Sequence, residues 1–105
     1  MFELENKLAV LREICGQAIE RYGKENQLLQ AAEELAELTQ AISKAKRYKG
    51  QSYIDGVAEE IADVLIMITQ IQMIFGITDY AIEAEMERKS KRLRNLLRVE
   101  KERTW

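Results

Sequence analysis

The chain has 105 residues, of which 47% are apolar and 32% charged, a length and composition typical of one globular domain spanning residues 1–105. It contains no histidine, and its one cysteine, Cys15, has no second cysteine with which to form an internal disulfide. These features exclude histidine-dependent catalysis and zinc sites built from histidine or several cysteines. A metal ion would need oxygen ligands, which favours Mg²⁺, Mn²⁺ or Ca²⁺.

The net charge of −2 is unevenly distributed along the chain. Residues 86–103, which we call the basic arm, carry eight Lys or Arg and three Glu, a charge of +5 that leaves −7 for the remainder. Such a division predicts that the acidic body and the basic arm either complement each other or share an anionic ligand.

We expect neither a targeting segment nor a membrane span. The first residues lack a basic region followed by an apolar core. The longest stretch without charge runs over the 15 residues 64–78. As a helix it would be about 22 Å long, which is short of the roughly 30 Å hydrocarbon layer. A cytoplasmic location is therefore the expectation.

Proline is absent, and apolar residues recur at intervals of three and four, which predicts long helices. The first is expected over residues 3–21, followed by Gly23 as a left-handed cap. The second is expected over residues 25–47, ending in cations that suit a helix C-terminus. Residues 48–51 are expected to form a loop.

The third helix is predicted from a capping box at Ser52 and Asp55 to about Phe75. It is apolar around most of its circumference, so it needs more cover than one short bundle supplies, which indicates an oligomer. Gly76 should end it, and Thr78 should cap a fourth helix that continues to about residue 98 or beyond. The predicted fold is all-α, an oligomeric four-helix bundle.

Two acidic clusters interrupt the apolar pattern of the second and third predicted helices: Glu33-Glu34-x-x-Glu37 and Glu59-Glu60-x-x-Asp63. Each contains two carboxylates three residues apart, which project from one face of a helix. If the two helices are antiparallel neighbours, four carboxylates converge. Their mutual repulsion would be relieved by a divalent cation, and Mg²⁺ keeps open positions for water and phosphate oxygens. The pattern therefore favours magnesium-assisted phosphate chemistry.

Glu33-Glu34-x-x-Glu37 and, after a gap of 22 residues, Glu60-x-x-Asp63 resemble the E-E-x-x-E…E-x-x-D motif of the MazG-like all-α nucleoside triphosphate pyrophosphohydrolases. The flanking strings over residues 31–38 and 59–65 are similar as well. The resemblance implies Mg²⁺-dependent cleavage of a nucleoside triphosphate to the monophosphate and pyrophosphate, with Mn²⁺ as a possible substitute. It implies metal ligands at Glu34, Glu37, Glu60 and Asp63.

The same resemblance places Glu33 at the first acid of the motif, where it would orient water, and gives Glu59 a similar but less supported position. Glu33 and Glu37 are therefore the expected catalytic carboxylates. Because histidine is absent, the general base is either a carboxylate or a hydroxide on the metal.

In the basic arm, Lys91, Asn95 and Arg98 are spaced four and three residues apart, on one helix face. They resemble a K-x-x-x-N-x-x-R stretch with which the family contacts phosphate or base, although a solvated cationic face has the same pattern. The segment from Lys44 to Lys49 is a second candidate, which would close over phosphates while Tyr48 or Tyr53 stacks on a base. Ordinary helix-end chemistry explains its charges equally well.

The expected partners are the nucleotide substrate and further copies of the chain, as a homodimer or a dimer-of-dimers tetramer. Nucleic-acid binding is not expected, because the net charge is negative and no aromatic residues alternate with the cations. The alternative function is a non-catalytic helical module whose acidic clusters pair with the basic arm of a neighbour.

Overall fold

The computed structural model describes residues 2–103, which form four α-helices and, within that range, no strand. The helices are α1 (Phe2–Tyr22), α2 (Lys24–Arg47), α3 (Gln51–Phe75) and α4 (Asp79–Arg103). The predicted all-α architecture with four helices is confirmed. The ends of α1, α2 and α3 lie close to the predicted ones, and α4 continues beyond residue 98, as the prediction allowed.

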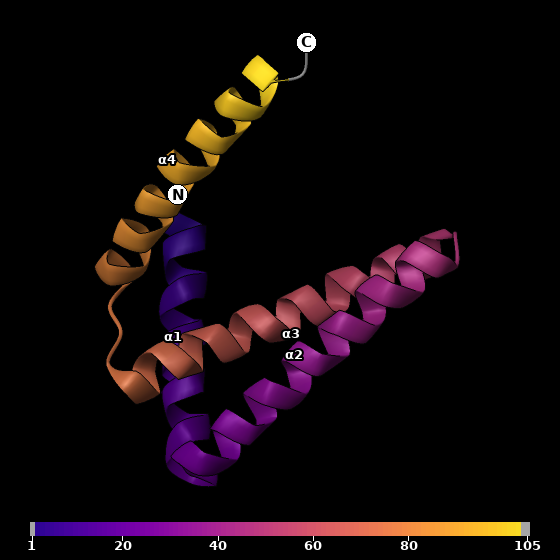
Figure 1. The fold of residues 1–105 in the computed structure, drawn as a ribbon. Coiled ribbons are helices and arrows are strands. Elements are labelled where there is room, and N and C mark those ends of the chain that lie inside the picture. The colour runs from indigo at the N-terminus through magenta and orange to yellow at the C-terminus, as the bar shows by residue number, and fades with distance from the viewer. Residues whose placement is uncertain (1, 104–105) are drawn as a thin grey trace.

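The α2–α3 hairpin is the largest unit of the fold. The two helices run antiparallel and side by side, and α1 lies against the end of the hairpin at which α2 begins and α3 ends (Figure 1). A link of three residues, 48–50, joins α2 to α3. Such a short link makes consecutive helices antiparallel neighbours, which is the arrangement that the acidic clusters require.

The buried core lies where α1, α2 and α3 meet. Among the residues whose side chains the structure describes, its apolar members are Cys15, Ala31, Val64 and Met67. Cys15 is fully buried, its Sγ lies 3.8 Å from the carbonyl oxygen of Ile66, and burial raises the pKa of its thiol. Two polar side chains, Gln27 and Gln70, are also buried there.

The residues at the ends of the helices differ in part from the predicted caps. Gly23 has a positive φ of 88°, but its ψ of 151° is not that of the left-handed helical cap that the sequence predicts. Gly76 is left-handed, with φ 66° and ψ 31°, and ends α3 as expected. The hydroxyl of Thr78 accepts a hydrogen bond from the amide of Ala81 at 3.1 Å, which confirms the predicted cap of α4.

The capping box predicted at Ser52 and Asp55 is wrong. The N-cap of α3 is Gly50, whose φ of 150° favours glycine, and no side chain caps the helix. Gln51 is already helical, and its Nε2 donates to Asp55 Oδ1 at 2.9 Å. Because the helix begins before Ser52, the hydroxyl of Ser52 lies within the first turn of α3 and does not precede the helix, as an N-cap would.

Helix α4 extends away from the other three (Figure 1) and packs against none of them within the described part of the chain. All its residues whose side chains are described are exposed. An ion pair ties its first residue to α1, because Arg12 Nη2 lies 2.7 Å from Asp79 Oδ2. In the part of the chain that the structure describes, α4 is therefore attached at its start and packs on no other helix.

None of the four helices, over the residues described, is by itself long and apolar enough to cross a lipid bilayer. Only α3 and α4 taken together, with a bend of 115° between them, meet that measure of length and composition.

Candidate functional site

Three of the predicted carboxylates converge between α2 and α3. One oxygen each from Glu34, Glu37 and Glu60 lies within 4.8 Å of the other two. Glu34 and Glu37 share a face of α2 because three residues turn an α-helix by about 300°. The antiparallel hairpin brings Glu60 of α3 to the same level. We call these three residues the carboxylate cluster.

Two oxygens of the carboxylate cluster are buried without a partner. Glu34 and Glu60 are half-buried, and the Oε2 atom of each is inaccessible to solvent and accepts no hydrogen bond from any residue that the structure describes. The other oxygen of Glu34 accepts a hydrogen bond from Gln30 Nε2 at 3.0 Å. Leaving buried acceptors unsatisfied is costly, so these oxygens require a proton or a ligand.

The electrostatics of the cluster lead to the same requirement. The negative charge of Glu34 is the main cause that raises the pKa of Glu37, followed by loss of solvation. For Glu60, loss of solvation between the helices is the main cause that raises the pKa, followed by the charge of Glu37. Both carboxyl groups therefore hold protons more tightly than an isolated glutamate does, and a cation would relieve the same repulsion.

The other predicted acids surround the cluster. Asp63 is half-buried, and its charge contributes to raising the pKa of both Glu37 and Glu60, but it does not lie within 4.8 Å of all three cluster oxygens. Glu33 is exposed, and its charge contributes least to the shift of Glu37. The structure thus brings three of the four expected metal ligands together and places Asp63 and Glu33 around them.

The chemistry of this donor set fits a hard divalent cation. Its ligand atoms are carboxylate oxygens, which Mg²⁺ and Mn²⁺ prefer over nitrogen or sulfur. Two of the carboxylates have an inaccessible oxygen that lacks a hydrogen-bond donor, and an ion would satisfy such an atom. Glu34, Glu37 and Glu60 could hold such an ion, with Asp63 at the edge of the same site.

A groove adjoins the carboxylate cluster on the hairpin and has a volume of about 540 Å³. Its lining combines Glu37 and Glu60 with residues nearer the α2–α3 link: Gln40, Ala41, Lys44, Ser52, Tyr53, Gly56 and Glu59. The sequence indicates Lys44 and Tyr53 as a secondary possibility but gives no signal for Gln40 or Ser52. Gln40 and Ser52 lie near each other because α2 pairs with α3, and the apolar pattern of a single helix does not indicate how two helices pair.

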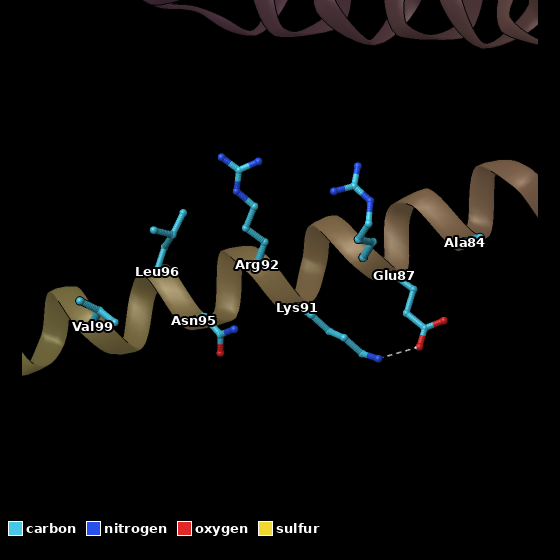
Figure 2. Close-up of a pocket in the computed structure, with 8 residues that line it drawn as sticks. Ala84, Glu87, Lys91, Arg92, Asn95, Leu96 and Val99 are labelled. Atoms are coloured by element: carbon cyan, nitrogen blue, oxygen red, sulfur yellow. Dashed lines mark ion pairs between the residues drawn. The ribbon is translucent and has the colours of Figure 1, made fainter.

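The residues of the basic arm lie elsewhere. Lys91 and Asn95 line a shallow open surface along α4, and the ammonium of Lys91 lies 3.2 Å from a carboxylate oxygen of Glu87 (Figure 2). Arg98 follows on the same exposed helix. The structure does not bring these three side chains to the carboxylate cluster, because α4 lies against neither α2 nor α3.

Comparison of the chain with protein-family models, with curated proteins and with solved structures gave no match.

Proposed function

We propose that this protein is a Mg²⁺-dependent nucleoside triphosphate pyrophosphohydrolase, which cleaves a ribo- or deoxyribonucleoside triphosphate to the monophosphate and pyrophosphate. The observation that carries the proposal is the convergence of Glu34, Glu37 and Glu60, two of which have a buried oxygen without a partner. The likeness of the two acidic clusters to the MazG-like motif, seen in the sequence alone, gives the reaction class.

In this proposal Glu34, Glu37 and Glu60 hold the Mg²⁺ ion together with Asp63, and Mn²⁺ can substitute for it. When bound, the ion supplies positive charge at the phosphate oxygens and lowers the pKa of a water molecule. Glu33, which is exposed beside the cluster, orients the attacking water. Glu37 belongs to both the metal-binding and the catalytic set, as the resemblance to the family motif implies.

We further propose that the protein acts as a homodimer or a dimer of such dimers. On α3, Ile54, Ile61, Leu65, Ile68 and Phe75 form an apolar stripe with spacings of three, four and seven residues, and each is between 40 and 61% exposed. We call this the α3 stripe. A single chain leaves it in water, which is the usual sign of a protein–protein interface.

The total surface supports an assembly. The accessible surface of one chain is 9092 Å², whereas a compact monomer of 12.2 kDa exposes about 6,100 Å². The excess, about 3,000 Å², is well above the roughly 800 Å² that each partner buries in a standard interface. Assembly would also let Lys91, Asn95 and Arg98 contact a phosphate. Within one chain α4 lies away from the carboxylate cluster, but α4 of one copy can lie beside the cluster of another.

The experiment that tests the proposed reaction is a screen for pyrophosphate release across ribo- and deoxyribonucleoside triphosphates, with Mg²⁺ and with Mn²⁺. We expect turnover of at least one nucleotide, and loss of about 100-fold or more of kcat in Glu37→Gln and Asp63→Asn, because charge stabilisation of this kind contributes a factor of that order. Glu20→Gln, an exposed acid on α1, is the matched control.

Helical content measured by circular dichroism should be the same in all three variants. A protein that releases no pyrophosphate from any nucleotide with either metal would contradict the proposal. Full activity in Glu37→Gln would show that the cluster is not the site of reaction.

The alternative function, a non-catalytic module, is favoured by the exposed basic arm and the acidic body. In that case the acids pair with a neighbour's arm, and Mg²⁺ should not raise the melting temperature. A native-state metal site would raise it by mass action. Thermal unfolding with and without Mg²⁺ distinguishes the two functions without relying on a known substrate.

A further inference from the structure

The groove beside the carboxylate cluster changes character along its length. Glu37 and Glu60 lie at one end, and Lys44 and Tyr53 lie seven residues away on α2 and α3 respectively. Because the helices are antiparallel, going from Glu37 to Lys44 on α2 and from Glu60 to Tyr53 on α3 leads in the same direction. Seven residues correspond to about 10 Å of helix. The groove therefore runs from an acidic end to an end that contains a cation and an aromatic ring.

The ring of Tyr53 is held in place from the side of the α2–α3 link. It stacks on Tyr48, with ring centroids 5.4 Å apart and an angle of 29° between the planes. The guanidinium of Arg47 lies 5.9 Å from the centre of the Tyr48 ring. Tyr53 remains 37% exposed and lines the groove, so this stack orders a ring that is still accessible to a ligand.

Lys44 adds a positive charge where the groove leaves the acids. It is exposed, and no ion pair involves it in the part of the chain that the structure describes. The first turn of α3, which contributes Ser52 and Tyr53 to the lining, contains no acidic residue that would neutralise the positive end of the helix dipole. This end of the groove is therefore favourable for an anion next to an aromatic group.

We propose that Tyr53 and Lys44 form the nucleoside end of the substrate site. Tyr53 stacks on the base, and Lys44 contacts the phosphate nearest the sugar, while the phosphates beyond it lie toward the carboxylate cluster. The groove volume of about 540 Å³ is within the range of small-molecule sites. This inference rests on the proposed function and adds the part of the chain that tells a nucleotide from an inorganic polyphosphate.

Because stacking tolerates any base, Tyr53 gives affinity for nucleosides without choosing among them. The test is calorimetric titration, with Mg²⁺ present, of α,β-methylene-ATP, which resists cleavage between the α- and β-phosphates, and of inorganic tripolyphosphate. We expect Tyr53→Ala to weaken the nucleotide analogue about tenfold and to leave tripolyphosphate unchanged. Tyr53→Phe should bind like the unaltered protein, because it keeps the ring.

Lys44→Ala should weaken both ligands, whereas Lys24→Ala should weaken neither, since Lys24 is an exposed lysine at the other end of α2 that does not line the groove. If the protein binds and cleaves nucleotides but Tyr53→Ala and Lys44→Ala bind like Lys24→Ala, the inference is wrong and the proposed function stands. If the unaltered protein binds neither ligand and cleaves no nucleotide, both fail. Melting curves of each variant establish that it is folded.

Discussion

Gln27 and Gln70 form a polar contact inside an otherwise apolar core. Both are at most 9% exposed, and Gln27 Nε2 donates to Gln70 Oε1 at 2.7 Å. Gln27 precedes Glu34 by seven residues and Gln70 follows Asp63 by seven, so this pair lies about two helical turns from the acids on the same faces. A directional bond at this position fixes how far α2 is shifted along α3, and with it the distances between carboxylates.

We expect Gln70→Leu to lower the free energy of unfolding by about 1–3 kcal/mol, because the buried amide of Gln27 then lacks its acceptor. The double variant Gln27→Leu/Gln70→Leu should recover much of that loss, since both polar groups are gone. Urea unfolding followed by circular dichroism measures both. A double variant that is less stable than Gln70→Leu would show that packing volume, and not the hydrogen bond, determines the effect.

The raised pKa values of Glu37 and Glu60 predict a pH dependence of stability. Because their pKa values in the folded protein exceed the unfolded ones, the native state binds more protons in the window above the ordinary glutamate value of 4.5. Their contribution to stability is therefore present at low pH and is lost as the pH rises through that window. In metal-free buffer we expect Glu37→Gln to flatten this dependence.

Magnesium should stabilise the protein more at high pH than at low pH, which is the opposite of the effect of protons. The ion competes with protons for the same oxygens, so it should raise the melting temperature more at pH 7 than at pH 5. Thermal scans at both pH values, with Mg²⁺ or with EDTA, measure the difference. An equal shift at both pH values, or one that persists in Glu37→Gln, would mean that the ion binds elsewhere.

At the scale of the element, the glycines of α3 illustrate two opposite roles. Gly76 is left-handed at the end of the helix, where a side chain is strained. Gly56 lies inside the helix, and an added Cβ would meet no other atom within 4 Å. We expect Gly76→Ala to lower stability by about 1 kcal/mol and Gly56→Ala to raise it by a similar amount. Melting temperatures moving in the same direction would contradict this assignment.

The four helices were predictable, because the spacing of apolar residues and the glycines at helix ends are local properties of the sequence. The convergence of Glu34, Glu37 and Glu60 was predictable as well, since a spacing of three residues and a short link determine it. The start of α3 was not, because Ser52 is a good cap only if the helix begins two residues later than it does. The placement of Tyr53 beside Lys44 depends on how α2 pairs with α3, which the apolar pattern leaves open.

The position of α4 could not be predicted for a different reason. Its apolar and cationic residues suit a packed helix, but the described part of the chain offers it no surface beyond the contacts of Asp79 with Arg12 and Gln72. If the packing partner of α4 is another copy, as we propose, the sequence of one chain does not indicate where α4 lies. The proposed phosphate contacts of Lys91, Asn95 and Arg98 therefore depend on the assembly rather than on the fold of one chain.

At the scale of the whole molecule, the shape is too open for a self-contained domain. The radius of gyration is 17.7 Å and the longest dimension is 58 Å, whereas a compact domain of this length has a radius of gyration of about 13 Å. An arrangement that covers the α3 stripe would make the unit compact. The proposed assembly with a second copy of the chain would account for both the open shape and the exposed stripe.

We expect light scattering to give at least twice the 12.2 kDa mass of one chain. Leu65→Glu should reduce the assembly to monomers, because Leu65 is 57% exposed in one chain and a charge is tolerated there only in water. Gln17→Glu, which adds the same charge at an exposed polar position of α1, should leave the mass unchanged. A monodisperse monomer of the unaltered protein would contradict the proposed assembly.

The separation of α4 from the hairpin has a consequence for how this protein evolves. The residues that would hold the ion all belong to α2 and α3, whereas the basic arm belongs to a helix that supports none of them. Outside Lys91, Asn95 and Arg98, substitutions in the arm carry almost no penalty in the folding of the single chain, so drift can change its other charges while the acids proposed to bind the ion are preserved. Among descendants of this chain, the last quarter should diverge fastest at every position except these three.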